Sequence, residues 1–148
     1  MEKNKFQILL ADDDATDRQL FKQAFDELNR KIILQIVNDG EQLMTYLTRK
    51  ITVLPQLIFL DLNMPLKNGI TCLKEIKAIE NLKDIPVAIY STSTSEKDKR
   101  ETFIHGANIY IQKPDDFNIL KQLLEKVITT TSLYEAPPFN KAHFLLNL

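Results

Sequence analysis

The stretch LIFLDLNMPLKNG, residues 57–69, joins a run of four apolar residues to an aspartate, a proline and then a glycine turn. A continuous apolar run is typical of a strand that is covered on both faces, as in a parallel sheet between two layers of helices. Asp61 therefore stands at the end of a buried strand, where a carboxylate without a partner is destabilising. We expect the rest of the sequence to supply that partner or a function.

Apolar runs alternate with segments of helical periodicity along the chain, and this alternation indicates βαβ units that build one parallel sheet. Strands are predicted at 6–11, 32–36, 57–60, 87–90 and 109–112. The first, third and fourth runs are almost wholly apolar and should be central strands. Gln35 interrupts the second run and Gln112 ends the fifth, so these two strands should lie at the edges. The predicted fold class is α/β, with helices on both faces of the sheet.

Helices are predicted between the strands, where apolar residues recur at intervals of three and four. They should begin at Asp14 or Thr16, after Gly40, after Gly69, at about residue 95 and after Pro114. The first has its apolar stripe at Leu20, Phe21, Ala24, Phe25 and Leu28. Segment 95–106 has few apolar residues, so this fourth helix should be short and exposed, ending at Gly106. The fifth has a strong apolar stripe and should dock firmly.

Length, charge and composition restrict the class of protein. The chain has 148 residues and a formal net charge of −1, which suits one domain without bulk attraction to nucleic acid or anionic lipid. It contains no stretch typical of a signal peptide or a membrane span, so we expect a cytoplasmic protein. The pattern changes after residue 130, which predicts a domain at 1–130 and an extension at 131–148 that packs on the domain or forms a homodimer contact. Cys72, the single cysteine, should be a core residue.

Polar side chains gather where the predicted strands end. Asp12, Asp13 and Asp14 follow the first strand, Asp61 follows the third, Ser91 and Thr92 follow the fourth, and Lys113 follows the fifth. Ligands of open parallel sheets bind outside the carboxyl ends of the strands. We therefore expect these side chains to form one site.

Three carboxylates at one sheet edge repel each other unless a cation lies between them. Asp12, Asp13 and Asp61 therefore predict a metal site, and oxygen ligands that leave room for water and phosphate favour Mg²⁺. Contiguous aspartates do not fit the alternating ligands of a calcium loop, and one cysteine with two histidines argues against zinc. Asp14 suits a helix cap better than a metal ligand.

A carboxylate beside Mg²⁺, with a lysine and a hydroxyl at the same place, is suited to accept a phosphoryl group. Asp61 would be the nucleophile, Lys113 would stabilise charge on the transferred group together with Mg²⁺, and Ser91 would hydrogen-bond a phosphate oxygen. The residues alone thus predict a Mg²⁺-dependent phosphoryl acceptor.

Four segments together resemble the signature segments of the response-regulator receiver family. They are LLADDD (9–14), the stretch at 57–69, YSTS (90–93) and IYIQKP (109–114). The resemblance covers residues 5–128 and implies a doubly wound, flavodoxin-like sheet of five strands in the order 2-1-3-4-5. It implies that Asp61 is the phospho-acceptor. It also implies that Asp12 and Asp13 hold Mg²⁺ with Asp61 and the backbone carbonyl of Asn63.

The resemblance further implies a switch. Ser91 matches the switch hydroxyl, Tyr110 matches the aromatic side chain whose rotamer follows it, and Lys113-Pro114 matches a position that is often a cis peptide. Asn63 and Ser93 match the positions that tune dephosphorylation. Phosphorylation would draw Ser91 toward the phosphate, turn Tyr110 inward, and change the face formed by the fourth helix, fifth strand and fifth helix.

The function that the resemblance implies is that of a single-domain response regulator in a two-component phosphorelay. Its partners would be a sensor histidine kinase, of a phytochrome-like or hybrid type, or a histidine phosphotransfer domain, and an unidentified downstream protein. It would be no enzyme beyond Mg²⁺-dependent self-phosphorylation and self-dephosphorylation. One alternative is a receiver-like interaction module that acts without phosphorylation. The other is a haloacid-dehalogenase-type phosphatase, whose motif requires an aspartate where this chain has Asn63.

Overall fold

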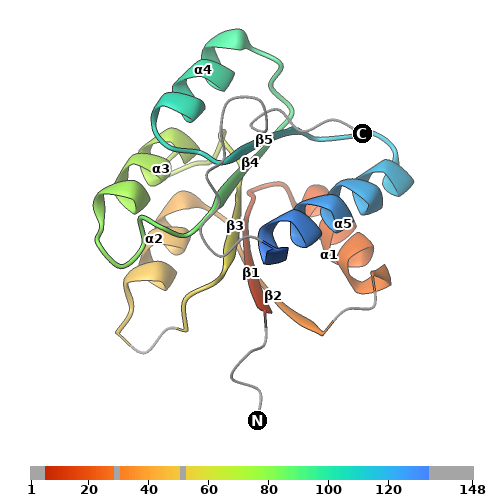
Figure 1. Cartoon of the computed structure of the whole chain (residues 1–148). Helices are drawn as coiled ribbons and strands as arrows, with labels where there is room; N and C mark the ends of the chain where they lie inside the picture. The colour runs from red at the N-terminus through yellow and green to blue at the C-terminus, as the bar shows by residue number, and fades with distance from the viewer. Residues whose placement is uncertain (1–5, 29–30, 51–52, 134–148) are drawn as a thin grey trace.

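Five parallel strands form one sheet in the computed structural model (Figure 1). The structure describes residues 6–28, 31–50 and 53–133. The strands are β1 (Phe6–Ala11), β2 (Ile32–Val37), β3 (Leu57–Leu60), β4 (Val87–Ser91) and β5 (Ile109–Gln112). Their order across the sheet is β2-β1-β3-β4-β5, so the predicted fold class and strand order are confirmed.

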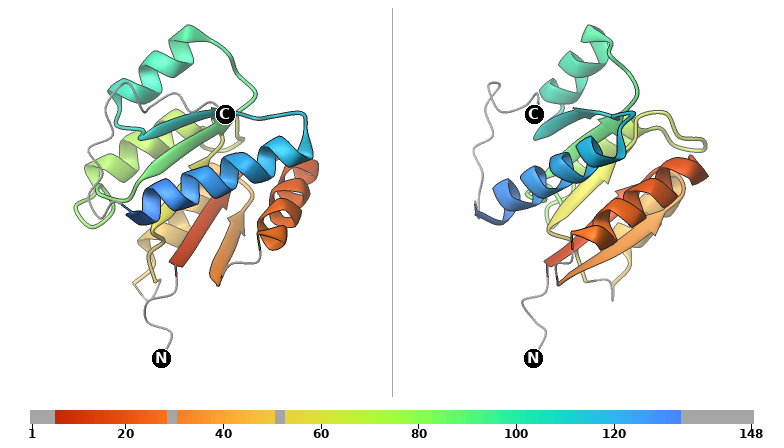
Figure 2. Two further views of the ribbon diagram at one scale, coloured as in Figure 1. Left: turned by 45° about the vertical axis from the view of Figure 1, so that its right-hand side comes forward. Right: turned by 90° about the vertical axis from the view of Figure 1, so that its right-hand side faces the viewer.

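The strands alternate with helices that cover both faces of the sheet. The helices are α1 (Ala15–Glu27), α2 (Gly40–Thr48), α3 (Gly69–Ala78), α4 (Glu96–Ile104) and α5 (Phe117–Leu133). Figures 1 and 2 show α1 and α5 side by side on one face, with α2, α3 and α4 on the other. The chain winds in opposite directions from β1, and the loops at this switch point diverge to leave an accessible edge at the carboxyl ends of the strands.

Each face of the sheet has its own apolar core. Under α1 and α5, the Phe21 ring lies edge-on to Phe59 and Tyr90, with ring centroids 5.0 Å and 5.5 Å apart. Under α2 and α3, the second core includes Leu73 and the fully buried Cys72, as expected for that cysteine. Every residue of β3 and β4 is buried, whereas the residues of β2 are partly exposed. The assignment of central and edge strands is therefore confirmed.

α4 is as short and exposed as its sequence predicts. Its two large apolar residues, Phe103 and Ile104, are 36% and 66% exposed. The buried position is Thr102, whose hydroxyl donates to the backbone carbonyl of Asp98 one turn earlier. The helix ends where Gly106 adopts a φ of 98°, a left-handed conformation that glycine tolerates well. Little apolar surface therefore holds α4 against the sheet.

Two local expectations are wrong. Helical spacing puts Leu20 on the apolar stripe of α1, yet its side chain is 41% exposed. Phe21, Ala24 and Phe25 already fill the space between this helix and the sheet. The cis peptide implied for Lys113-Pro114 is also wrong, because the described residues contain no cis peptide bond. The trans isomer is the more stable one at most X–Pro bonds.

The described part of the chain ends at Leu133, the last residue of α5. Residues 134–148 lie outside the described part, so the boundary at residue 130 and the packing or dimer contact of the extension 131–148 stay predictions. Among the described residues, no helix combines the length and apolar character that crossing a membrane requires.

Gly69 allows α3 to begin directly against the end of β3. A Cβ at this position would lie 2.3 Å from the carbonyl oxygen of Asp61 and 2.7 Å from the Cα of Leu62. Because both atoms belong to the backbone, relief requires the chain itself to move. We predict that Gly69→Ala lowers the free energy of unfolding by roughly 2–3 kcal/mol in urea denaturation.

The matched control is Thr71→Ala, an exposed position in the same helix. It should change the free energy of unfolding by less than about 0.5 kcal/mol. Equal effects of the two substitutions would show that the close approach at Gly69 is unimportant.

Candidate functional site

The side chains of the candidate site are fixed by the sheet itself. Asp12, Asp61 and Lys113 are each the first residue beyond a strand, and the backbone N–H of each donates to the neighbouring strand. The distances are 3.2 Å from Asp12 to β2, 3.0 Å from Asp61 to β1 and 2.8 Å from Lys113 to β4. Because the parallel ladder continues one residue past the strands, it holds these three side chains at one edge.

The three predicted metal ligands come together as expected. Asp12, Asp13 and Asp61 each offer a carboxylate oxygen, and these oxygens all lie within 4.8 Å of one another. Asp12 and Asp61 are 0% and 5% exposed, whereas Asp13 faces solvent. Two buried carboxylates in contact require positive charge nearby.

Asp12 has a buried oxygen that attracts positive charge. Its Oδ1 accepts a hydrogen bond from the N–H of Asp14 at 3.0 Å. Its Oδ2 is buried, and the ammonium of Lys113 lies 2.9 Å from it as an ion pair. A buried carboxylate oxygen requires positive charge of this kind, from an ammonium or a metal ion. The hard oxygen atoms at this edge thus suit a small divalent cation.

Lys113 supplies positive charge from the protein itself. Its Nζ lies 2.9 Å from Asp12 Oδ2 and 3.6 Å from Asp61 Oδ2, and its side chain is 8% exposed. The ammonium thus partly neutralises the buried charge on Asp12 Oδ2. The ammonium also lies 5.3 Å from the ring centroid of Tyr90, which favours the cation.

Burial controls the ionisation of the site. It raises the pKa of Asp61 to about 7, against the lowering effect of Lys113, while the Asp12 carboxylate raises it further. Burial likewise raises the pKa of Asp12, and Lys113 opposes this. For Lys113, burial disfavours the charged form, but the carboxylates of Asp12 and Asp17 outweigh it and raise the pKa. The lysine therefore stays protonated while Asp61 titrates near neutral pH.

Asp17 is a site residue that the sequence analysis missed. Its Oδ2 lies 2.8 Å from Lys113 Nζ, the shortest distance between that ammonium and a carboxylate among the described residues. An acidic residue in the first turn of a helix usually indicates no more than a favourable interaction with the helix dipole. The two residues are 96 positions apart, so no local pattern signals their contact.

The two predicted switch residues lie at the same edge. Ser91 is fully buried at the end of β4, and its Oγ accepts a hydrogen bond from the N–H of Ser93 at 3.1 Å. Tyr110 is 2% exposed, and its hydroxyl donates to the carbonyl of Ser93 at 2.9 Å. The structure therefore describes the inward orientation of Tyr110, which the sequence analysis assigned to the phosphorylated state.

The two predicted tuning residues have different environments. The hydroxyl of Ser93 donates to Asp98 Oδ2 in α4 at 2.6 Å and accepts from the N–H of Ser95 at 3.2 Å. Ser93 is thus engaged with the start of α4. Asn63 is exposed beyond β3, and its backbone amide lowers the pKa of Asp61 against the larger effect of burial.

Known signalling proteins share the sequence pattern and the fold of this chain. The family model of the response regulator receiver domain matches residues 8–125. A probable methanogenesis regulatory protein, FilR2 of Methanothrix harundinacea, is 33% identical over 128 residues, which is 84% of this chain and 83% of that protein. The segment matched by the family model contains every residue of the candidate site.

Two solved structures share the fold over nearly their whole length. The phosphorylated cyanobacterial phytochrome response regulator RcpA has 32% identity and a TM-score of 0.83, covering 90% of this chain and 99% of that chain. The Mn(2+)-bound form of response regulator Rcp1 has 29% identity and a TM-score of 0.80, covering 89% and 99%. One of these proteins is phosphorylated and the other holds a divalent metal.

The raised pKa of Asp61 predicts a pH-dependent stability in EDTA, where divalent metal is removed. The pKa is about 7 in the folded chain and about 3.9 in an unfolded one. The folded chain therefore favours the protonated carboxyl. Its contribution to the free energy of unfolding is fully present below about pH 4 and is lost as the pH rises through about 7. We predict that Asp61→Asn raises the free energy of unfolding by roughly 1–3 kcal/mol at about pH 8, and by less at about pH 5.

Urea denaturation at the two pH values measures this difference. Asp115→Asn removes an exposed carboxylate that lies near Lys113 in sequence, so its effect should be the same at both. An advantage of Asp61→Asn that does not grow with pH would contradict the electrostatic description of the site.

Proposed function

Since this chain belongs to the response regulator receiver family of two-component signalling, we propose that it accepts a phosphoryl group on Asp61 in a Mg²⁺-dependent reaction. One observation carries the proposal. The buried carboxylate of Asp61 lies at the accessible edge of the sheet, 3.6 Å from Lys113 Nζ and within 4.8 Å of the carboxylate oxygens of Asp12 and Asp13. This family consists of signalling modules, so the reaction is a modification of the chain and not the turnover of a substrate.

The phosphoryl donor would be a phosphohistidine of a sensor histidine kinase or a histidine phosphotransfer domain. A carboxylate oxygen of Asp61 attacks the phosphorus, the P–N bond breaks as the new O–P bond forms, and the histidine nitrogen keeps the electron pair. Lys113 stabilises negative charge on the transferred group, and the Ser91 hydroxyl donates a hydrogen bond to a phosphoryl oxygen. Water later attacks the phosphorus, breaks the bond to Asp61 and releases inorganic phosphate.

Asp12, Asp13, Asp61 and the backbone carbonyl of Asn63 are the residues that would hold Mg²⁺. When bound, the ion supplies charge neutralisation at the phosphoryl oxygens. The clustered carboxylate oxygens of Asp12, Asp13 and Asp61 support this ligand set, and so does the Mn(2+)-bound form of Rcp1 among similar structures. Before phosphorylation, Asp12 and Asp61 keep the site anionic enough to attract a divalent cation despite the presence of Lys113.

The output of the switch would be the face formed by α4, β5 and α5. Movement of Ser91 toward a phosphate disturbs its hydrogen bond with Ser93, which also contacts Tyr110 in β5 and Asp98 in α4. The change therefore reaches α4 through one residue. Asn63 and Ser93 are proposed to tune dephosphorylation, and a downstream protein would read the altered face.

A phytochrome-like or hybrid kinase is the proposed source of the signal. The similar structures include a cyanobacterial phytochrome response regulator, RcpA, over 90% of this chain. We further propose that residues 1–130 form the receiver and that the extension 131–148 packs on it or contributes to a homodimer.

The second candidate function is an interaction module that acts without phosphorylation. The observation in its favour is the orientation of Tyr110, which is already 2% exposed and bonded to Ser93. A partner that recognises the inward orientation of Tyr110 could bind this state directly.

Intact-mass analysis after incubation with acetyl phosphate separates the two functions. We predict that the chain gains one phosphoryl group when Mg²⁺ is present and none when EDTA replaces it. Asp61→Asn should abolish the gain, whereas Asp115→Asn should leave it unchanged. Absence of the adduct from wild-type protein at all sampling times, the earliest included, would favour the module that acts without phosphorylation.

Ser91→Ala should separate phosphorylation from its output. Loss of one hydrogen bond to the phosphoryl group should slow adduct formation about fivefold, while α4 should lose its response. The measurement is amide hydrogen exchange in α4 with and without acetyl phosphate. The exposed neighbour Thr92→Ala is the matched control and should respond as the wild type does. If α4 responds equally in Ser91→Ala, the switch does not pass through this hydroxyl.

A further inference from the structure

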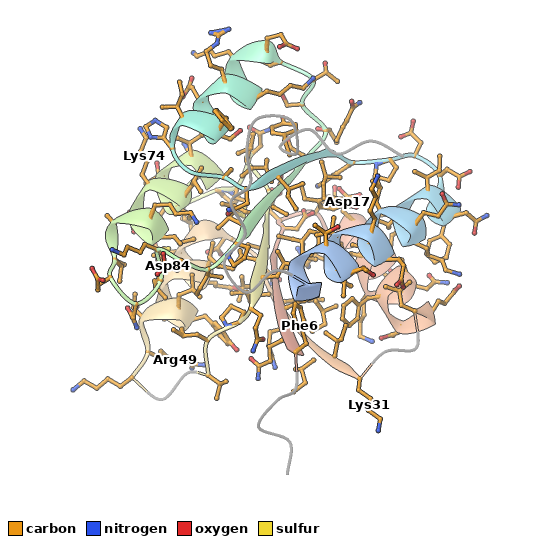
Figure 3. All side chains as sticks on the ribbon, viewed as in Figure 1. Phe6, Asp17, Lys31, Arg49, Lys74 and Asp84 are labelled. Atoms are coloured by element: carbon orange, nitrogen blue, oxygen red, sulfur yellow. The ribbon has the colours of Figure 1, made fainter. Side chains whose placement is uncertain are left out.

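Lys113 lies between carboxylates from three elements of the fold. Its Nζ is 2.8 Å from Asp17, 2.9 Å from Asp12 and 3.6 Å from Asp61. Asp12 and Asp61 follow the central strands, whereas Asp17 belongs to the first turn of α1, where Figure 3 labels it. The lysine is therefore drawn in two directions, toward the metal ligands and toward the helix.

The start of α1, which carries Asp17, is held in place. The N–H of Asp17 donates to the side chain of Asp14, the N-cap of α1, at 2.9 Å. The next residue, Arg18, donates from its guanidinium to the carbonyl of Asp12 at 2.9 Å. Phe21, one turn further along α1, is fully buried in the core. These contacts fix the start of α1 beside the site and keep the Asp17 side chain within reach of Lys113.

An ammonium and a divalent cation compete for the same oxygens. Asp12 Oδ2 already lies 2.9 Å from Lys113 Nζ, whereas Asp61 Oδ2, at 3.6 Å, is less closely paired with it. If Asp17 lost its charge, the remaining attraction would draw Nζ toward Asp61, because opposite charges attract strongly at a site with little water. The ammonium would then lie closer to the place where the cation binds.

We propose that Asp17 is a positioning residue that holds the Lys113 ammonium toward α1 and so leaves the carboxylate of Asp61 available to a divalent cation. This inference rests on the proposed function, because it concerns the same metal site. It gives Asp17 a role in metal affinity although it is not itself a metal ligand.

The test measures metal binding alone, with no phosphoryl donor present. Free Mn²⁺ is followed by electron paramagnetic resonance during titration of the full chain. Asp17→Asn should raise the Kd for Mn²⁺ about fivefold, as expected for the loss of roughly 1 kcal/mol of favourable interaction. Asp17→Glu keeps the charge and should return the Kd to within about twofold of the wild-type value.

Asp14→Asn is the matched control. It removes one negative charge from the same turn of the chain, keeps a side chain that caps helices well, and does not involve a contact with Lys113. It should change the Kd by less than about twofold, since exposed charges at this distance are screened. An equal loss in Asp14→Asn would show that Asp17 acts by general charge, and would overturn the proposal.

A double-mutant cycle decides whether the effect passes through the lysine. In a Lys113→Met background, Asp17→Asn should change the Kd by less than about twofold, because no ammonium remains to be positioned. A fivefold loss that persists there, or an unchanged Kd in Asp17→Asn alone, would overturn the proposal. If Lys113→Met does not fold, the contrast between positions 14 and 17 and the Glu variant still decides the question. Wild-type protein that binds no Mn²⁺ would contradict the proposed metal site itself.

Discussion

The burial of two carboxylates at the end of a parallel sheet is the constraint on which the rest of the site depends. Asp12 and Asp61 follow adjacent central strands and are fixed by backbone hydrogen bonds to their neighbours, so they cannot separate. Charges held in this way need compensation. Lys113 supplies part of it, and the cluster of Asp12, Asp13 and Asp61 has the oxygen atoms that suit a divalent cation.

The core takes part in this arrangement through Tyr90. Its ring packs edge-on against Phe21 of α1 and Phe59 of β3, and the ammonium of Lys113 lies 5.3 Å from the ring centroid. The lysine ammonium is therefore stabilised both by the ring of Tyr90 and by the neighbouring carboxylates. Because burial disfavours a lone ammonium, the lysine depends on both. The packing of this half of the core and the electrostatics of the site cannot be changed independently.

The sequence predicts those features that repeat along the chain or stand at strand ends. Continuous apolar runs locate β1, β3 and β4, and the polar residues that follow them identify Asp12, Asp61 and Ser91. The resemblance was needed for the strand order, since periodicity does not say which strands are neighbours. Contacts between distant segments escaped prediction: Asp17 reaches Lys113 across 96 positions. Leu20 was misplaced because helical spacing gives the width of an apolar stripe but not how much of it the sheet can cover.

The weak anchoring of α4 has a mechanical consequence. Thr102 is the buried residue of this helix, whereas Phe103 lies partly and Ile104 largely in solvent. A displacement of α4 therefore exposes little additional apolar surface. The opposite layer is stiff, because α1 and α5 share a core with the aromatic cluster. Small forces at the sheet edge will therefore deform one side of the molecule and leave the other unchanged. A substitution that buried more of α4 would make the protein more stable and, by the same change, less responsive.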